Sequence, residues 1–483
     1  MPQISFRDPE GFVVAGPAAQ PVFRVTKQES ADRILALLGS AMGKRLVDAG
    51  DFIRTGVASP DERQSVLDRA GYAGYAGHIG QTSSSTVLEH ERIWFPTYPS
   101  EWTRGMLRES GLLTLRLAET LLTAGHGLKD ATPWNVLFRG AKPVFIDALS
   151  VEQRQARDPL WRPLSQFLST FAYPLWLDEW KGVGVHEAFM GRREGWATEE
   201  MYQRLSWRDR LRPRALSWIT VAEWMRNEAK EASYRPAAAH DEETTRYILG
   251  RLFRRLRRML ENSPDGLDRG SHWSSYQTHC HYDREAREAK RVFVAAAMVG
   301  ATHVLDLGAN DGEYSLLAAE QGARVVAVEG DPQAANEIWR HAHRAGLNIL
   351  PVVMNLAQPT PSTGWRNREQ TAFFDRAAGE FDCVLMLALL HHLTVTERVP
   401  LAWILDLAAD LTRRTLIIEY VSPEDPFYRR LLRGRDRLHT GDTREAFEAQ
   451  LGHRFLIRRQ QPVIEGRRHL YWCEKRCEKR NRV

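Results

Sequence analysis

The regular alternation of apolar runs and amphipathic stretches between residues 284 and 475 most constrains the fold of this chain. Short apolar runs at 303–308, 324–329, 349–355, 381–390 and 415–421 predict strands, and helical patterns at about 284–299, 313–321 and 331–346 lie among them. The segments FLIRRQQPV and RHLYWCEK alternate as a terminal hairpin does. Strands that alternate with helices form a doubly wound parallel sheet. We therefore predict a Rossmann-like α/β sheet of seven strands.

A second region precedes this sheet. The chain has 483 residues, which is too long for one ordinary hydrophobic core. The turn-forming stretch NSPDGLDRGS at 262–271 interrupts two helical patterns, and the region before it is rich in helical patterns and tryptophan. We predict a helix-rich domain over 1–265 and the α/β domain over 271–483.

The turn after the first predicted strand has a distinctive composition. In VLDLGANDGEYS (304–315) the pattern is Asp306-x-Gly308-x-Asn310-x-Gly312. A tight turn between a strand and a helix needs residues that accept positive φ, which glycine does freely and asparagine does next best. Small residues also let a ligand approach the backbone at the N-terminus of the next helix. The pattern predicts a ligand site at this turn.

The charges around the turn indicate the kind of ligand. The spacing is not GxGxxG, and Asp306 and Asp311 stand where a pyrophosphate needs amide donors without nearby negative charge. A ligand with sulfonium and ammonium groups and no phosphate suits such a turn. Glu329, at the end of the second strand, can accept hydrogen bonds from two ribose hydroxyls.

These residues resemble the class I S-adenosylmethionine-dependent methyltransferases, over 271–483. The resemblance implies a seven-stranded methyltransferase sheet and S-adenosyl-L-methionine as cofactor. It also implies that the methionine part of the cofactor is bound by Asp306, Gly308, Asn310 and Gly312. Glu329 would bind the ribose, and Asn355 would face the adenine. The segments GW (364–365), LALLHHL, IEYV and RHLY resemble a bacterial group of methyltransferases that includes nodulation-protein relatives.

Three side chains are candidate catalytic residues that would act on the methyl acceptor. His391 and His392 follow the fourth strand, where an imidazole that titrates near neutral pH can act as a general base. The alternative is that one histidine caps the following helix and contacts the cofactor without proton transfer. Glu419 in the fifth strand is the third candidate, and its alternative is a structural acid near the site. Trp273, Tyr276 and Tyr282 precede the first strand, where family members often have a segment that covers the cofactor, and the alternative for these aromatic side chains is ordinary packing.

The first domain carries a second pattern in GHGLKDATPWNVLFRGAKPVFIDALS (125–150). Asp130, Asn135 and Asp147, with a predicted helix at about 101–124 before them, resemble the catalytic loop and metal-binding acid of protein kinases and aminoglycoside phosphotransferases. The resemblance covers about 85–150 and implies a kinase-like α+β domain. It also implies ATP and magnesium at these three residues.

This second pattern departs from the kinase family in two places. Leu128 stands where the family usually has a histidine, and no glycine-rich phosphate loop precedes it. Lys27 and Lys44 are available, but neither can be assigned to phosphate binding. Three interpretations stay open: an active phosphotransferase, a degenerate kinase-like scaffold that binds substrate, partner or nucleotide, and coincidence. We favour the degenerate scaffold.

Charge and cysteine content limit the partners. The net charge of +5, from 66 basic and 61 acidic residues, does not favour nucleic acid, and the arginine-rich stretch 251–260 is interpreted as a solvated amphipathic helix. Four scattered cysteines make a disulfide framework improbable, and no metal site is expected. No apolar run has transmembrane length and no leader pattern is present, so we expect a cytoplasmic protein without a membrane partner.

The leading hypothesis is methyl transfer to oxygen or nitrogen of a small molecule, such as a metabolite, glycan or natural product. The first alternative is a protein or RNA methyltransferase whose N-terminal domain recognises the substrate. The second is a bifunctional protein whose N-terminal domain binds ATP. Nothing in the sequence identifies a protein partner.

Overall fold

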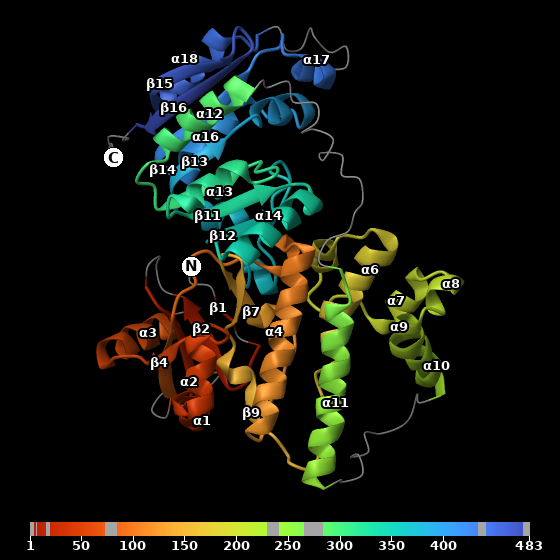
Figure 1. The fold of residues 1–483 in the computed structure, drawn as a ribbon. Helices are drawn as coiled ribbons and strands as arrows, with labels where there is room; N and C mark the ends of the chain where they lie inside the picture. Colours follow the sequence, from red (N-terminus) through yellow and green to blue (C-terminus); the bar gives the residue numbers. More distant parts are fainter. Residues whose placement is uncertain are drawn as a thin grey trace. The chain divides into compact units, whose positions relative to one another are not determined.

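The computed structural model describes residues 4–5, 7–15, 20–72, 85–228, 241–264, 284–432 and 441–476 (Figure 1). The chain divides into two compact units. Unit 1 comprises Met1–Leu267 together with the segment Thr363–Gln370, and unit 2 comprises Asp268–Ser362 and Thr371–Val483. The expected aromatic cover over the cofactor, including Trp273, lies outside the described residues.

Unit 2 is built on a seven-stranded sheet of order β12-β11-β10-β13-β14-β16-β15. The five strands from β10 to β14 pair in parallel, whereas β16 is antiparallel to both of its neighbours. This confirms the predicted Rossmann-like sheet and its terminal hairpin. The strands are β10 (His303–Leu307), β11 (Arg324–Glu329), β12 (Ile349–Val353), β13 (Phe381–Met386), β14 (Thr412–Val421), β15 (Phe455–Ile464) and β16 (Arg468–Lys475).

Helices cover this sheet, and local sequence explains where they start and stop. The Asp331 side chain accepts the backbone amides of Gln333 and Ala334 at the start of α14, and Gly346 ends that helix at φ 66°. Helix α14 contacts β11 and β12, α16 contacts β13 and β14, and α12 contacts β14 and β15. The helices are α12 (Arg284–Ala297), α13 (Glu313–Glu320), α14 (Pro332–Ala345), α15 (Phe373–Ala377), α16 (Leu401–Leu411), α17 (Pro426–Leu432) and α18 (Arg444–Arg454).

The fourth strand of this sheet is shorter than its apolar run. The run extends to residue 390, but β13 ends at Met386, and Ala388 has φ 51°. A residue in the left-handed region cannot continue a β-ladder, and for alanine this conformation costs roughly 1–3 kcal/mol. The chain then turns into a short helical segment, His392–Thr396. The prediction of a strand over 387–390 is therefore wrong, because backbone conformation overrides the apolar pattern there.

Unit 1 begins with a five-stranded antiparallel sheet of order β1-β2-β3-β5-β4. Its core contains Phe12, Phe23, Val25 and Val87, with Val66 packed against them. The strands are β1 (Ile4–Ser5), β2 (Gly11–Ala15), β3 (Val22–Lys27), β4 (Thr55–Val57) and β5 (Ser85–His90), and the helices beside them are α1 (Gln28–Gly39), α2 (Ala41–Asp48) and α3 (Pro60–Tyr72).

The rest of unit 1 is mainly helical. Helix α4 (Arg104–Thr123) contacts α11 (Glu242–Glu261), whose buried Leu249, Phe253, Leu256 and Leu260 form one stripe at helical spacing. Two small antiparallel sheets of two strands follow α4: β6 (His126–Leu128) with β9 (Val151–Gln153), and β7 (Val136–Arg139) with β8 (Lys142–Phe145). The remaining helices are α5 (Leu164–Phe167), α6 (Tyr173–Lys181), α7 (Thr198–Arg204), α8 (Trp207–Arg210), α9 (Pro213–Ala215) and α10 (Val221–Glu228).

Within the described part of the chain, none of these helices is both long and apolar enough to span a bilayer.

Candidate functional site

A cleft of about 750 Å³ opens in unit 2 at the carboxyl ends of β10, β11 and β13. In a parallel sheet this edge, beside the point where strand order reverses, is the place where ligands bind. The cleft is lined at its polar end by Asp306, Gly308, Asn310, Glu329, Lys290 and Tyr314, and elsewhere by Asn355, Leu387, Ala388, His392, Thr396 and Arg468, among others.

The turn after β10 has the backbone conformation that its sequence predicts. Gly308, Asn310 and Gly312 have φ values of 75°, 52° and 78°. Gly308 and Asn310 line the cleft, but Gly312 does not lie among its lining residues and instead precedes α13. A Cβ on Gly312 would lie 2.8 Å from Cγ1 of Ile338. Helix packing and φ therefore both require glycine at 312.

Glu329 is held at the rim of the cleft by two backbone amides. Its Oε2 accepts the amide of Asn310 at 2.7 Å, and its Oε1 accepts the amide of Asp331 at 2.8 Å. Burial raises the pKa of this carboxyl, while the amide hydrogen bonds act in the opposite direction. Each carboxylate oxygen keeps a further lone pair, so the oriented group can also accept hydroxyl donors from a ligand.

Asp306 lies deeper, at the end of β10. It is 3% exposed, and its Oδ2 accepts a hydrogen bond of 2.7 Å from the Ser315 hydroxyl. Burial raises the pKa of Asp306 to about 6, and the neighbouring Glu329 and Asp311 act in the same direction. A buried carboxyl of this kind is stabilised in its charged form when a cation lies beside it.

Asn355 lines the cleft beyond β12, next to Met354 and Leu356. Its Oδ1 accepts the backbone amide of Ala357 at 2.9 Å, so this side chain stabilises the loop after the strand. Apolar neighbours beside a single polar group are typical of a pocket for a planar heterocycle.

The two histidines point to different places. His392 lines the cleft, whereas His391 is 1% exposed and does not lie among the lining residues. Both ring nitrogens of His391 lack a hydrogen-bond partner among the described residues, and its ring stacks on Tyr428 with centroids 6.2 Å apart. Burial lowers the pKa of His391 well below its ordinary value and lowers that of His392 to about 4. Of the two histidines, His392 is therefore the one that lies at the cleft.

Glu419 lies beneath the cleft in a buried charge network. Its Oε2 accepts the Lys290 ammonium at 2.7 Å, and the Arg468 guanidinium lies 3.8 Å from its Oε1. Arg468 also pairs with Asp425 at 2.7 Å. Glu419 does not line the cleft, but Lys290 and Arg468 do. Neither basic residue could be predicted from the sequence, because no spacing motif connects them to Glu419.

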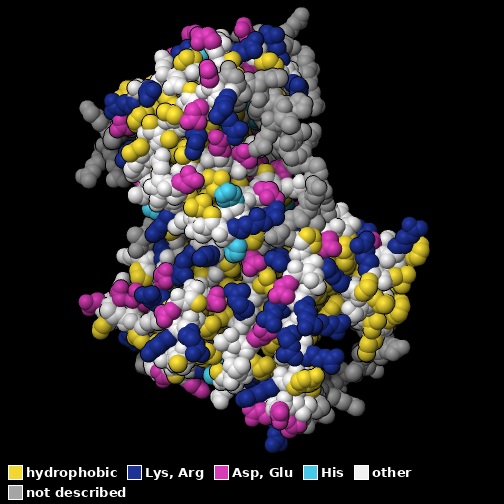
Figure 2. Space-filling view, viewed as in Figure 1, with side chains coloured by type: hydrophobic (Ala, Val, Ile, Leu, Met, Phe, Trp, Pro, Cys, Tyr) yellow, Lys and Arg dark blue, Asp and Glu magenta, His cyan; other side chains and the backbone are white. Residues whose placement is uncertain are grey.

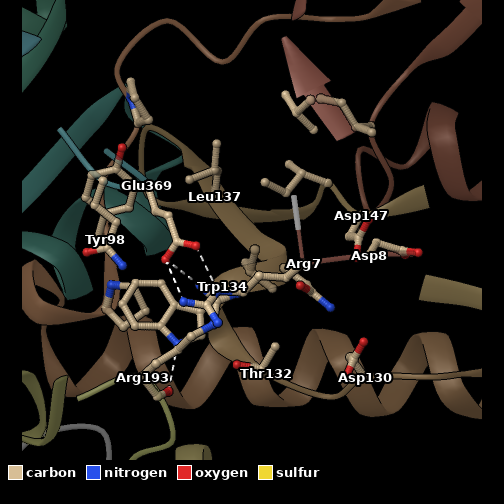
Figure 3. Close-up of a pocket in the computed structure, with 18 of the residues that line it drawn as sticks. Arg7, Asp8, Tyr98, Asp130, Thr132, Trp134, Leu137, Asp147, Arg193 and Glu369 are labelled. Carbon is tan, nitrogen blue, oxygen red and sulfur yellow. Dashed lines mark hydrogen bonds and ion pairs between the residues drawn. The ribbon is translucent and has the colours of Figure 1, made fainter. Parts of the chain in front are cut away.

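Unit 1 holds a separate cavity of about 860 Å³ (Figure 3). Asp130, Asn135 and Asp147 all line it, so three residues grouped by their sequence pattern also meet in space. In Figure 3, Asp130 and Asp147 lie at one end of the cavity, and Trp134 and Arg193 lie towards the other.

The polar end of this cavity does not fit a magnesium ion. Oδ1 of Asp147 accepts the Arg24 guanidinium at 2.6 Å, and Oδ1 of Asp130 accepts the amide of Gln166 at 3.3 Å. The side-chain amide of Asn135 donates to Ser150 at 3.4 Å. Over the described ranges, no group of three or more His, Cys, Asp or Glu side chains could hold a metal ion. A guanidinium therefore already neutralises the acid to which the kinase resemblance gives a metal-binding role.

No protein-family model matches the sequence. The nodulation protein NoeA of Rhizobium meliloti (strain 1021) is 30% identical over 492 residues, which cover 98% of this chain and 95% of that protein.

Among solved structures, the N-methyltransferase NodS from Bradyrhizobium japonicum WM9 is 13% identical, with a TM-score of 0.29, over 40% of this chain and 98% of that one. Magnesium protoporphyrin IX methyltransferase (ChlM) from Synechocystis PCC 6803 is 20% identical, with a TM-score of 0.30, over 48% of this chain and 96% of that one. Scores this low do not establish a shared fold, so the fold assignment rests on the strand order of unit 2.

Proposed function

This chain belongs to the family of the nodulation protein NoeA, and we propose that its unit 2 transfers a methyl group from S-adenosyl-L-methionine to a small-molecule acceptor. The acceptor atom is oxygen or nitrogen of a metabolite, glycan or natural product. Because the name of the relative refers to nodulation, a molecule exchanged or modified during nodulation is the first class of acceptor to test.

The placement of two carboxyls at the edge of the sheet supports this proposal above all. Asp306 is the penultimate residue of β10 and Glu329 is the last residue of β11, a turn of positive φ follows β10, and both carboxyls line the cleft. A dinucleotide would bring phosphates against Asp306 and Asp311, and these two acids would repel the phosphates. A cofactor with a cationic sulfonium, an ammonium and a ribose, but no phosphate, has groups that match the carboxyls of the cleft. When bound, this cofactor supplies an electrophilic methyl group.

The residues of the cleft divide the work of binding. We assign Asp306 to the cationic methionine part and Glu329 to the ribose hydroxyls, with Gly308 and Asn310 giving close backbone approach. Asn355 and its apolar neighbours face the adenine. Lys290 lies beside Tyr314, its ammonium 5.4 Å from the ring centroid, at the end of the cleft that holds Asp306. These groups orient the cofactor and exclude water from the reacting end.

The acceptor end is assigned to His392, Thr396 and Arg468. His392 holds its imidazole neutral at pH 7 because burial lowers its pKa to about 4. A neutral imidazole can accept a hydrogen bond from a hydroxyl or amine and orient its lone pair for attack. With so low a pKa it is a weak base, so we propose orientation as its main role. Glu419 acts through Lys290 and Arg468 as a positioning residue.

The size of the cleft favours a small acceptor over a macromolecule. Its volume of about 750 Å³ is within the range of small-molecule and cofactor sites and must hold cofactor and acceptor together. The alternative, a protein or RNA acceptor recognised by unit 1, would leave label in a macromolecule.

The test uses methyl-labelled S-adenosylmethionine, the full chain and an extract of the source organism. The extract is separated into small molecules, protein and nucleic acid, and label is counted in each fraction. Label among small molecules that is lost in the Glu329→Ala variant supports the proposal. Label confined to protein or RNA contradicts the small-molecule acceptor. Failure of the chain to bind S-adenosylmethionine by calorimetry contradicts methyl transfer itself.

A second candidate function, ligand binding in the cavity of unit 1, has its own support. Asp130, Asn135 and Asp147 meet around one cavity of about 860 Å³, while the Arg24 pair argues against a metal-dependent reaction there. We propose a kinase-like scaffold that binds a ligand without transferring phosphate. ATP titrated with and without magnesium tests this: binding that requires magnesium and disappears in Asp147→Ala would restore the phosphotransferase interpretation.

A further inference from the structure

Large hydrophobic side chains are exposed together over one short stretch of unit 1. Trp207, Leu211, Trp224 and Met225 are 68%, 59%, 56% and 64% exposed, and Leu216 and Val221 are also exposed. Figure 2 shows hydrophobic side chains gathered over the part of the molecule where Figure 1 places α7 to α10. We call these side chains the α8–α10 face, defined as Trp207, Leu211, Leu216, Val221, Trp224 and Met225.

Helix α10 is turned with its apolar stripe outward. Val221, Trp224 and Met225 have the i, i+3, i+4 spacing of one helical face, and all three are exposed. Glu223, on the other side of the helix, is only 8% exposed. A helix of a water-soluble domain ordinarily buries its apolar stripe and exposes its carboxylates. The reversed orientation indicates a surface that contacts something other than water.

The charge of this segment has one sign at the surface. Both acids within 207–225, Asp209 and Glu223, are buried, and Asp209 pairs with Lys181 at 2.5 Å and with Arg212 at 3.0 Å. Arg208 and Arg212 are exposed in the same stretch. Between residues 207 and 225 the described surface therefore presents apolar side chains and guanidinium groups without an exposed carboxylate.

The arginine-rich helix α11 adjoins this face. The Arg255 guanidinium lies over the Trp218 ring, 4.5 Å from its centroid, and Trp218 belongs to the segment between α9 and α10. Arg254 and Arg258 are exposed on the same helix. Because of this contact the basic side of α11 and the α8–α10 face lie close together, and the apolar surface is bordered by cations.

We propose that the α8–α10 face docks on an anionic lipid bilayer, with its aromatic and aliphatic side chains in the interfacial layer and Arg208 and the exposed arginines of α11 over the headgroups. Exposed tryptophan and aliphatic side chains next to arginines are the features of interfacial helices that lie on, and do not cross, a membrane. This inference does not depend on methyl transfer, and it replaces the expectation that the chain has no membrane partner.

Two other occupants fit the surface less well. A second copy related by a two-fold axis would place arginines opposite arginines and offers no exposed carboxylate within 207–225 to pair with them. A single-stranded nucleic acid would use the arginines and tryptophans, but Leu211, Val221 and Met225 offer no ring on which a base can stack. A bilayer uses all of these side chains.

Co-sedimentation of the full chain with vesicles tests the proposal. Vesicles of phosphatidylcholine alone are compared with vesicles containing about 30% phosphatidylglycerol, at low and high salt. We expect binding to the anionic vesicles only, weakened by salt because the headgroup attraction is screened. The double variant W207S/W224S should lower partitioning by roughly tenfold or more, through loss of buried apolar area. Arg208→Gln should lower it by about fivefold.

Trp403→Ser is the matched control, because Trp403 is 68% exposed but lies on α16 of unit 2. It should leave vesicle binding unchanged. Circular dichroism and thermal unfolding show whether each variant is folded. The proposal is overturned if the native chain does not bind anionic vesicles, or if folded W207S/W224S binds them as well as the native chain. Two further results would overturn it when the native chain binds no vesicles. One is a dimer, seen by light scattering, that the double variant no longer forms. The other is a complex with an oligonucleotide that the double variant no longer forms.

Discussion

The Lys290 ammonium lies 2.7 Å from Oε2 of Glu419, with the two side chains almost completely buried. Lys290 is on α12 and Glu419 is on β14, so the ion pair joins a helix at the wall of the cleft to the interior of the sheet. Arg468, on β16, extends the network to Asp425. The position of the cleft wall thus depends on ion pairs within the protein.

Removing the lysine should destabilise unit 2 strongly. In Lys290→Met the Glu419 carboxylate loses its nearest cation in a buried site, and breaking such a pair costs about 3–5 kcal/mol. Urea unfolding measures this difference. The double variant K290M/E419L removes both charges and should recover much of the loss. Equal stability of K290M and the native chain would show that the pair contributes nothing.

Glu329→Ala should weaken binding of S-adenosylmethionine by tenfold or more. The substitution removes the acceptor assigned to the ribose and frees the amides of Asn310 and Asp331 that orient the turn. Glu329→Gln keeps one oxygen acceptor and should lose less affinity. Calorimetric titration gives both values, and an unchanged dissociation constant for the alanine variant would refute the assignment.

Cofactor affinity should depend on pH through Asp306. Burial raises the pKa of Asp306 from 3.8 to about 6 in the folded chain. Without ligand, the free energy of unfolding therefore falls by about 3 kcal/mol as the pH rises from below the unfolded-state pKa of Asp306 to above its folded-state pKa. A cationic ligand needs the ionised form, so affinity should be highest above pH 6 and fall below it. Asp306→Asn should bind weakly at all pH values, and titrations from pH 5 to 8 measure the difference.

The neighbouring histidines should give opposite results. His392→Ala removes a side chain that lines the cleft and should lower kcat by about 10²-fold with little change in stability. His391→Leu replaces a buried imidazole without hydrogen-bond partners among the described residues and should retain turnover within a few fold. Steady-state kinetics and thermal unfolding separate the two. Loss of turnover in folded H391L would indicate that His391 acts as the general base.

Gly312→Ala should destabilise unit 2 by two separable effects. The φ of 78° is unfavourable for alanine by roughly 1–2 kcal/mol, and the new Cβ would lie 2.8 Å from the Ile338 side chain. The double variant G312A/I338A removes the contact but keeps the φ strain. Its own control is I338A, which measures the cavity left by the isoleucine. If G312A lowers the free energy of unfolding by no more in the native background than in the I338A background, the contact with Ile338 is not a source of strain.

Much of the site could be predicted because its determinants are local. The turn of Gly308 and Asn310 follows from steric limits on φ, and Asp306 and Glu329 reach one edge because parallel strands end there. Residues 387–390 differ from this pattern: their apolar run predicts a strand, but Ala388 has a positive φ and the strand ends before it.

The order of strands and helices along the chain, the parallel sheet and the turn of positive φ after β10 follow from the amino-acid sequence. Hydrophobic periodicity and residue type act over a few neighbouring positions, so these features can be predicted without tertiary contacts. The position of His392 at the cleft and of His391 in the interior depends instead on the tertiary structure. It alone brought Lys290 to Glu419 and Arg24 to Asp147, partners 129 and 123 residues apart. Such pairs depend on how whole elements pack, because side-chain direction and long-range contact are properties of the folded chain.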